Sequence, residues 1–385
     1  MQETSEIVNV GVYDRKIDLF ESMYPVPDGM AYNSYVILDE KAAVMDTVDA
    51  AFTDEWLKNV QKALGKRLPS YLIVQHMEPD HSASILAFLR AYPNVEMIAT
   101  KKAFVMMKNF FGTAFSGRER VVQDGETLSL GKHTLTFIEA PMVHWPEVMM
   151  TYEHTTKTLF SADAFGAFGQ ADGEEWACEA RRYYFGIVGK YGVQVQNVLK
   201  KLAAFPISII RPLHGVVLEK EVKNALRLYD LWSRYEAEEK GVVICYTSVY
   251  GNTKKAVELL AQALKKRGCA VRVFDLARDD VFEAVEDAFR LDTLVLATTT
   301  YNGDMFPCMR TFLQALMERN FCKKTVAFIE NGSWSPMAAR IMQEKLSACK
   351  HLKYAQTLVR IVSALTPENE RQISALAEEL SNKKE

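Results

Sequence analysis

A run of six consecutive residues carries enough ligand chemistry for a metal centre. Residues 76–81 read HMEPDH and follow the apolar run YLIVQ at 71–75. They supply four candidate ligands: His76, Glu78, Asp80 and His81. Imidazole and carboxylate groups are common ligands of divalent metals in proteins. A buried strand that ends in such a segment predicts a metal site at the end of that strand.

Three more candidate ligands lie in loops that follow predicted strands. They are His144 in APMVHWPE, Asp163 in SADAFG and His214 in RPLHG. The chain has only seven histidines, and four of them fall in these loops and in HMEPDH. Unrelated core or surface histidines would rarely cluster in this way, so we expect one centre. A ligand set of imidazoles and carboxylates without thiolate favours iron over an iron–sulfur or zinc–cysteine site.

The composition limits the class of protein. With 385 residues, 49% hydrophobic and 25% charged, the chain predicts a globular protein of two domains. The net charge of −3 argues against a nucleic acid or an anionic membrane as partner. We find no signal-peptide pattern and no apolar run near the ~18 residues that span a bilayer. Six scattered cysteines without a CxxC pair suggest reduced thiols, so we expect a cytoplasmic location.

The first part of the chain alternates short apolar strands with helices. Strands are predicted at 35–38, 71–75, 134–138, 158–160 and 207–210, and helices at 53–64, 82–91, 101–110 and 195–204. Residues 219–240 then form one long, charge-rich helical pattern before a new apolar strand begins at 242. We therefore predict two domains, 1–240 and 241–385.

From residue 242 onward, strands and helices alternate regularly. Strands are predicted at 242–246, 270–274, 293–297, 325–330 and 357–361, and helices at about 253–267, 280–289, 307–319, 336–348 and 367–382. This α/β alternation predicts a doubly wound sheet of five parallel strands. Ligands of such sheets bind in the loops beyond the carboxyl ends of the strands.

Three of these loops suit a phosphorylated aromatic ligand. Residues 247–253, TSVYGNT, lead into a helix whose N–H groups favour a phosphate. They lack the lysine of nucleotide triphosphatases and the GxGxxG of dinucleotide folds. Tyr301 and Trp334 lie in the other two loops and could stack on a planar ring. The candidate cofactor-binding residues are Thr247, Ser248, Val249, Tyr250, Gly251, Asn252, Thr253, Thr299, Thr300, Tyr301, Asn302, Gly303, Asn331, Gly332, Ser333 and Trp334.

Two resemblances follow from these motifs. Residues 242–385 resemble flavodoxin, which implies bound FMN. The N-terminal pattern resembles the metallo-β-lactamase fold, an αββα sandwich whose hydrolytic members carry His-x-His-x-Asp-His. This chain has Glu78 at the second histidine position. His-x-Glu-x-Asp-His joined to a flavodoxin-like domain is similar to flavodiiron proteins, and this resemblance covers nearly the whole chain.

The flavodiiron resemblance implies a set of ligands for each iron and one bridge. The sets are His76, Glu78 and His144; Asp80, His81 and His214; and the bridge Asp163. In some members the histidine at the position of His81 does not bind iron directly. We expect Pro79 to turn the chain so that Glu78 and Asp80 both face the metals. The anionic oxygen ligand Glu78 favours ferric iron, which a redox reaction requires and a hydrolase does not.

The resemblance also implies an activity. Electrons would pass through FMN to the diiron site and reduce O2 to water, with reduction of NO to N2O, or both activities, as the alternative. A zinc-dependent hydrolase with a flavodoxin domain and an electron carrier with a structural N-terminal domain are the other classes. Pocket residues are expected among Trp145, Phe165, Phe168 and Tyr191.

The expected partners follow from the same resemblance. We expect a head-to-tail homodimer or a dimer of dimers, in which the flavin of one subunit serves the irons of the other. The sequence contains no CxxCG pair typical of rubredoxin. We therefore expect a separate electron donor, rubredoxin or alternatively reduced coenzyme F420.

Overall fold

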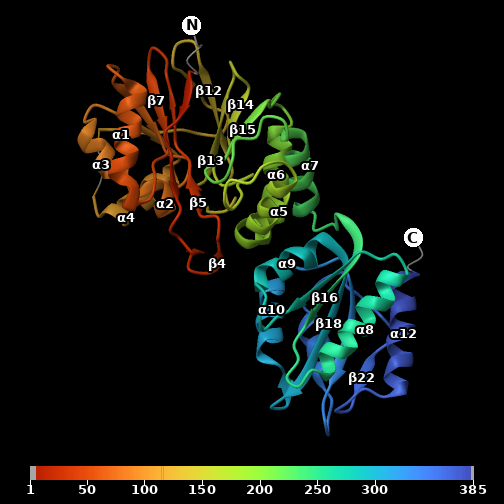
Figure 1. Cartoon of the computed structure of the whole chain (residues 1–385). Coiled ribbons are helices and arrows are strands. Elements are labelled where there is room, and N and C mark those ends of the chain that lie inside the picture. The colour runs from red at the N-terminus through yellow and green to blue at the C-terminus, as the bar shows by residue number, and fades with distance from the viewer. Residues whose placement is uncertain (1–5, 114, 116, 383–385) are drawn as a thin grey trace. The chain divides into compact units, whose positions relative to one another are not determined.

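The computed structural model describes residues 6–113, 115 and 117–382, and its chain divides into two compact units (Figure 1). These are Met1–Asp230 and Leu231–Glu385. The boundary predicted at residue 240 falls within strand β16 (Glu239–Tyr246), slightly beyond this division. The predicted limits of the domains stay a prediction.

The first unit contains two packed sheets. The six-stranded sheet has the order β1 (Ile7–Asn9), β6 (Tyr35–Ile37), β7 (Ala42–Met45), β8 (Pro69–Ile73), β9 (Glu96–Ala99) and β10 (Glu119–Val121). The five-stranded sheet has the order β11 (Thr127–Ser129), β12 (Thr134–Glu139), β13 (Met149–Glu153), β14 (Thr158–Phe160) and β15 (Ile209–Arg211). Two short pairs complete the unit: β2 (Val12–Asp14) with β5 (Met30–Tyr32), and β3 (Leu19–Phe20) with β4 (Tyr24–Pro25).

Apolar side chains from both sheets form one core. Ile37 and Ile73 from the first sheet pack in the same cluster as Leu135, Phe137 and Phe160 from the second. Alternate residues of a strand face opposite sides, so each sheet turns one apolar face toward the other. Burying each such side chain contributes ~1.5–3 kcal/mol.

Helices cover the outer faces of these sheets. They include α1 (Thr53–Leu64), α3 (Ile85–Ala91), α4 (Lys101–Phe111), α5 (Gly173–Tyr183) and α6 (Gly192–Leu202), whereas the four-residue α2 (Pro79–Ser82) lies in the segment after β8. Figure 1 shows α1 and α3 outside the first sheet and α6 outside the second. This arrangement confirms the predicted αββα sandwich.

The helix predicted at 82–91 is interrupted at its start. It begins as α2 and resumes as α3 after Ala83 and Ser84. Ser82 donates a hydrogen bond to the carbonyl of Met77 at 2.9 Å, and the Ser84 hydroxyl lies 2.7 Å from that of Thr53. Serine hydroxyls that bond in this way compete with continuous helix.

The helix predicted at 219–240 is too long. Helix α7 spans Val222–Ser233, and residues 239–240 already belong to β16. Tyr235 has a left-handed backbone with a φ of 56°. Trp232 Nε1 donates to Glu238 Oε1 at 2.6 Å, which fixes the turn between helix and strand.

The second unit contains a parallel sheet in the predicted topology. Its order is β17 (Val271–Asp275), β16, β18 (Leu291–Tyr301), β20 (Thr325–Asn331) and β21 (Lys353–Tyr354), and β22 (Val359–Ile361) also pairs with β20. The short β19 (Asp304–Met305) pairs antiparallel with β18. The main strands thus follow the flavodoxin order 2-1-3-4-5.

Helices lie on both faces of this sheet. In Figure 1, α8 (Asn252–Lys266) and α12 (Pro367–Ser381) lie on one face, and α9 (Val281–Arg290) and α10 (Pro307–Glu318) on the other. Helix α11 (Ala338–Leu346) follows β20. All five helices predicted for this part of the chain form, and the doubly wound fold is confirmed.

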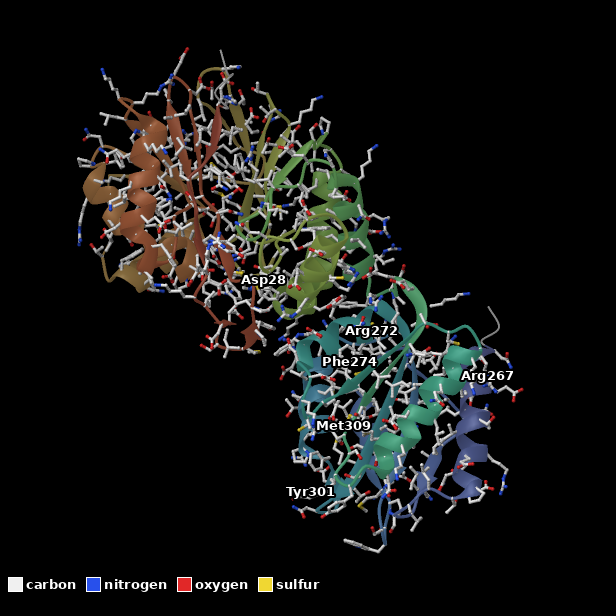
Figure 2. The ribbon with its side chains drawn as sticks, in the orientation of Figure 1. Asp28, Arg267, Arg272, Phe274, Tyr301 and Met309 are labelled. Atoms are coloured by element: carbon white, nitrogen blue, oxygen red, sulfur yellow. The ribbon has the colours of Figure 1, made fainter. Side chains whose placement is uncertain are left out.

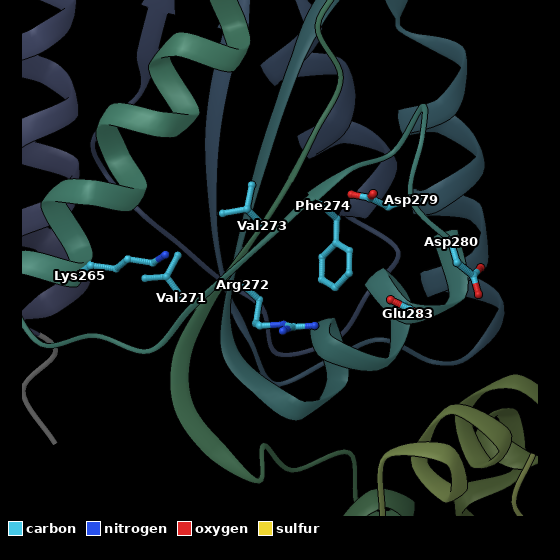
Figure 3. Close-up of a pocket in the computed structure, with 8 residues that line it drawn as sticks. All are labelled: Lys265, Val271, Arg272, Val273, Phe274, Asp279, Asp280 and Glu283. Atoms are coloured by element: carbon cyan, nitrogen blue, oxygen red, sulfur yellow. The ribbon is translucent and has the colours of Figure 1, made fainter. Parts of the chain in front are cut away.

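A hollow of about 570 Å³ lies along β17, the outer strand of this sheet, and beside the start of α9. Arg272 and Phe274 project to one side of β17 and Val273 to the other (Figure 3). The guanidinium of Arg272 lies 5.6 Å from the Phe274 ring and pairs with Asp287. Tyr301 lies at the opposite end of the sheet from Arg272 (Figure 2).

No helix among the described residues is long and apolar enough to cross a membrane.

Candidate metal centre and flavin site

Loops from both sheets of the first unit bring the seven predicted ligands together. HMEPDH follows β8, whereas the loops of His144, Asp163 and His214 follow β12, β14 and β15. The ligand atoms form two groups, each within 4.8 Å: His76, Glu78, His144 and Asp163; and Asp80, His81 and His214. The family pattern implies Asp163 as a bridge, whereas the ligand-atom distances put it in the first group.

The first group has the spacing of a metal site. His144 Nε2 lies 3.0 Å from both Glu78 Oε2 and Asp163 Oδ2. His76 Nε2 lies 3.2 Å and 3.4 Å from the same two oxygens. Bonds of about 2.1 Å at tetrahedral or octahedral angles separate neighbouring ligand atoms by about 3.0–3.4 Å. The first group therefore fits one metal ion.

The second group has two imidazoles that face each other. His81 Nε2 and His214 Nε2 are 2.9 Å apart, and Asp80 Oδ2 lies 3.4 Å and 3.3 Å from them. Asp163 Oδ1 lies 3.5 Å from His81 Nε2 and 3.8 Å from His214 Nε2. Asp163 thus presents one oxygen to each group, as a bridging ligand would.

Buried carboxylate oxygens in these groups also indicate a cation site. Within the described part of the chain, neither carboxylate oxygen of Asp80 nor Oδ1 of Asp163 has a hydrogen-bond partner. Buried polar atoms are otherwise almost always paired. Two divalent metals would satisfy them, and the mixed imidazole and carboxylate set suits iron.

Burial and neighbouring charges shift the pKa values of the ligands. Burial alone would lower the pKa of His76, but Asp163 and other carboxylates raise it well above its usual value. Asp163 and Glu78 likewise outweigh burial and raise the pKa of His144 to about 9. Burial lowers the pKa of His81 to about 4. The carboxylates of the first group thus favour positive charge at His76 and His144.

Proline and threonine side chains shape HMEPDH locally. Pro79 occupies the first position of α2, where its missing N–H costs nothing. Glu78 precedes this turn and Asp80 lies within it, so their carboxylates reach different groups. The backbone N–H and the hydroxyl of Thr47 both donate to the carbonyl of His81, at 2.9 Å and 2.8 Å.

Three buried residues near the ligands escaped the sequence analysis. Asp46 accepts hydrogen bonds from the backbone and side-chain N–H groups of Gln75 at 2.7 Å and 2.8 Å. Glu147 contacts His76, and the quoted motif APMVHWPE already contained it. Tyr183 is fully buried, and its hydroxyl has no hydrogen-bond partner among the described residues. Neither Asp46 nor Tyr183 lies in a motif that could have indicated it.

The Tyr183 ring packs beside the second group of ligands. It lies 5.5 Å from the ring of His214 and 5.2 Å from that of Phe168. Burial and then the negative charges of Asp163 and Glu78 raise the pKa of Tyr183 well above its usual value. The hydroxyl therefore keeps its proton at neutral pH.

The four predicted pocket residues lie at different distances from the ligands. The Trp145 ring is 5.3 Å from that of His76 and 6.1 Å from that of His144. The Phe168 ring packs against the rings of Phe20 and Tyr183 beside the centre. Phe165 packs on Tyr229 at 4.1 Å. Tyr191 ends a short 3-10 helix, and no ring contact joins it to the ligands in the described structure.

A hollow of about 550 Å³ lies at the carboxyl ends of β16, β18 and β20 in the second unit. Fourteen of the sixteen predicted cofactor-binding residues line it, together with Ser335, Met337 and Ser363. Thr247 and Gly251 do not line it. Thr247 is buried with its hydroxyl 2.5 Å from that of Thr298, and Gly251 precedes α8 with a φ of 88°.

The helix beginnings beside this hollow differ. The first N–H groups of α11 are occupied, since Met337 and Ala338 donate to Thr300 Oγ1 and Ala339 donates to Glu330 Oε2. At α8, Ser248 Oγ accepts only from the N–H groups of Gly251 and Lys254 at 3.1 Å and 3.3 Å. A phosphate therefore fits better at α8.

Aromatic rings border the same hollow. Tyr250 and Trp334 are 93% and 92% exposed, and Tyr301 is 46% exposed. Large apolar surfaces of this kind usually serve a ligand or a partner. Hydroxyls, amides and stacking rings together suit a flavin mononucleotide.

The site and the fold together define a metal-binding metallo-β-lactamase-like unit joined to a flavodoxin-like unit. The family model of the ODP family beta lactamase matches residues 30–215, and that of the flavodoxin domain matches residues 243–360.

Known proteins resemble the chain over nearly its whole length. The nitric oxide reductase of Moorella thermoacetica is 30% identical over 90% of this chain and 89% of its own. The structure of rubredoxin oxygen:oxidoreductase from Desulfovibrio gigas matches with a TM-score of 0.91 and 25% identity, covering 99% of this chain and 97% of the other. The flavodiiron protein of Giardia intestinalis matches with 0.91 and 25%, covering 98% and 96%.

The chain belongs to the flavodiiron protein family. It is an oxidoreductase whose cofactors are FMN and a diiron centre.

Proposed function

We propose that this protein reduces O2 to water. The observation that carries the proposal is Asp163, which presents its two oxygens to two metal-sized groups of ligands. When bound, FMN and two irons together supply four electrons, the number that converts one O2 and four protons to two waters. The similarity to a rubredoxin oxygen:oxidoreductase supports the same substrate.

The proposed metal ligands are the seven side chains of the two groups. His76, Glu78 and His144 would hold one iron, Asp80, His81 and His214 would hold the other, and Asp163 would be shared by both sets. Trp145 and Phe168, with the neighbouring Tyr183, border the space beside the ligands. Because Tyr183 keeps its proton, its hydroxyl can donate a hydrogen bond to an oxygen atom of the substrate.

Reduction of NO to N2O is the second candidate. The relative at 30% identity is named a nitric oxide reductase, which is the observation that favours it. That reaction joins two NO molecules and consumes two electrons and two protons, leaving N2O and water. The same pair of metal positions could bind two NO molecules side by side.

We also propose a protein electron donor and a homodimer. Rubredoxin is the proposed donor, because the similar structure from Desulfovibrio gigas is named for that partner. Reduced coenzyme F420 is the alternative. In a head-to-tail dimer, or a dimer of such dimers, a second copy would cover the exposed Tyr250 and Trp334 beside the flavin. Light scattering measures the molar mass in solution. A protein that is monomeric by this measurement and still fully active would contradict the dimer.

Oxygen consumption by the complete protein tests the proposed reaction. A reduced donor is supplied in excess, and O2 is followed with an electrode before and after addition of catalase. Reduction to water predicts no return of O2 when catalase is added. Return of half of the consumed O2 would show peroxide as the product and contradict the proposal.

A further inference from the structure

The two groups of metal ligands differ in what supports their imidazoles. In the first group, His76 Nδ1 donates to Glu147 Oε1 at 2.9 Å, and both side chains are fully buried. The same oxygen also accepts the backbone N–H of Met77 at 2.8 Å. This contact fixes the His76 ring with Nε2 toward the metal position and places a negative charge behind it.

Among the described residues, no carboxylate lies behind an imidazole of the second group. His214 Nδ1 donates to the neutral carbonyl of Ala31 at 2.8 Å. His81 Nδ1 is buried and finds no hydrogen-bond partner in the described ranges of the chain. At the Nδ1 atoms of the second group, the described residues therefore provide one hydrogen bond, and its acceptor is a neutral carbonyl.

The backbone supports of the two groups are more alike. Asp46 accepts from the N–H of His76 at 3.4 Å, and Thr47 donates twice to the carbonyl of His81. Each group thus has its main chain held by one of the two residues that follow β7. The carboxylate behind an imidazole ring is the feature that one group has and the other lacks.

A carboxylate behind a ligating histidine strengthens the metal bond. It holds the correct tautomer, orients the ring and makes the imidazole a better donor. Loss of such a partner typically weakens metal binding about 10–100-fold. Glu147 lies three residues after His144, so one loop supplies a ligand to the first group and supports another.

We propose that Glu147 is a positioning residue that makes the two metal positions unequal. The metal at His76, Glu78, His144 and Asp163 is held more tightly, and the metal at Asp80, His81 and His214 is released first. The inference rests on the proposed metal ligands. It does not depend on which substrate the centre reduces.

Metal release from the whole protein measures this inequality. The protein, loaded with ferrous iron and FMN under anaerobic conditions, is mixed with excess 2,2′-bipyridine, and the coloured iron complex is followed over time. The wild-type chain should release iron in two phases of equal size. Elemental analysis of protein desalted between the phases should give one iron per chain.

The variant Glu147→Gln then identifies the slow phase. Glutamine keeps the shape and an oxygen acceptor but removes the charge, so the slow phase should accelerate about 10–100-fold. The fast phase should change less than about threefold, and FMN content should be unchanged. Glu147→Asp keeps the charge on a shorter side chain and should give an intermediate rate, which provides a second reading if Glu147→Gln accumulates poorly.

A matched control exists within the same unit. Glu153 accepts from His133 Nδ1 at 2.9 Å, and both side chains are fully buried, as for Glu147 and His76. Glu153 ends β13 whereas Glu147 precedes its start, and neither Glu153 nor His133 is in a ligand group. Glu153→Gln should therefore leave both release phases as in the wild type.

Several outcomes would overturn the proposal. They are a single release phase in the wild type, acceleration of the fast phase in Glu147→Gln, and equal effects of Glu153→Gln and Glu147→Gln. Because the readout is iron release, it can fail while O2 or NO is still reduced. Conversely, two unequal phases in a protein that reduces neither gas would support the inference and contradict only the proposed function.

Discussion

The two cofactor sites of this chain are built on opposite physical principles. The metal centre is buried and charged, with seven side chains from four loops pointing at one another. The flavin hollow is open and nearly neutral, with hydroxyls, amides and exposed rings on strand ends. Like charges at the first site need cations to stay together, whereas the second site is shaped by the sheet and needs no ion.

This contrast gives different expectations for what each site loses. At the metal centre, one carboxylate belongs to both positions, so its loss should disable the whole centre. At the flavin hollow, contacts are spread over many residues, so single substitutions should have modest effects.

The largest effect is expected for Asp163→Ala. Removing the shared carboxylate leaves His76, His144, His81 and His214 without their common partner. O2 and NO reduction should fall about 10²–10³-fold, the range seen when a key electrostatic group is lost. Iron content by elemental analysis should fall while FMN content stays the same. A variant that reduces both gases normally would instead support a simple electron carrier.

A smaller effect is expected for Tyr183→Phe. The change removes a buried hydroxyl that has no hydrogen-bond partner among the described residues, so folding and iron content should be unaffected. Loss of one hydrogen bond to substrate should lower kcat about 10–100-fold, while the rate of FMN reduction by the donor stays constant. Tyr152→Phe is a control, since its hydroxyl donates to the carbonyl of Pro206 instead. Equal kcat values for the wild type and Tyr183→Phe would show that Tyr183 makes no such hydrogen bond to substrate.

The flavin site should respond more weakly to Trp334→Ala. Loss of one stacking ring, worth ~0.5–1.5 kcal/mol, should weaken FMN binding about 2–10-fold. Titration of the flavin-free protein with FMN, followed by flavin fluorescence, measures this change. Iron content serves as the internal control and should not move. A loss of iron equal to the loss of FMN would contradict separate sites.

Chelation and pH should distinguish the units by stability. With the metals removed, the pKa of His144 is about 9 in the folded chain, above the ~6.5 of an unfolded histidine. A pKa that folding raises stabilises the folded state, and this contribution is complete below about pH 6.5. It is lost as the pH rises through about 9. The chelated first unit should therefore melt at a lower temperature at pH 9 than at pH 6.5, by about 2–4 °C for each kcal/mol lost.

Metal loading should abolish that trend. Metals bind deprotonated histidines, so the loaded first unit should be at least as stable at pH 9 as at pH 6.5. Chelation should also lower the melting temperature of the first unit more than that of the second. Calorimetry with and without chelator measures both, and equal shifts in the two units would contradict a metal effect confined to one of them.

The same contrast explains what the sequence could predict. HMEPDH concentrates four ligands in one short segment, and regular strand–helix alternation defines the flavodoxin-like half, so both were predicted in advance. Strands such as β3 and β4 have two residues each and leave no periodic pattern. The helix predicted at 219–240 was too long because the contact of Trp232 with Glu238 overrides local helix propensity.

Local sequence patterns could not predict the residues whose role depends on tertiary contacts. Asp46 follows β7 and Tyr183 ends α5, and no motif joins either of them to HMEPDH. Glu147 lay inside a quoted motif, but its hydrogen bond to His76 spans 71 positions and could not be inferred from spacing. Ligand types are encoded locally, whereas the groups that orient the ligands are brought in by the fold.

The most direct test compares the two gases on the fully reduced protein. The protein is reduced anaerobically and mixed with O2 or with NO in a stopped-flow instrument, and flavin reoxidation is followed by absorbance. We expect faster and complete reoxidation by O2, with one O2 consumed per chain. Faster reoxidation by NO, with N2O formed, would contradict O2 as the main substrate and assign the centre to NO reduction.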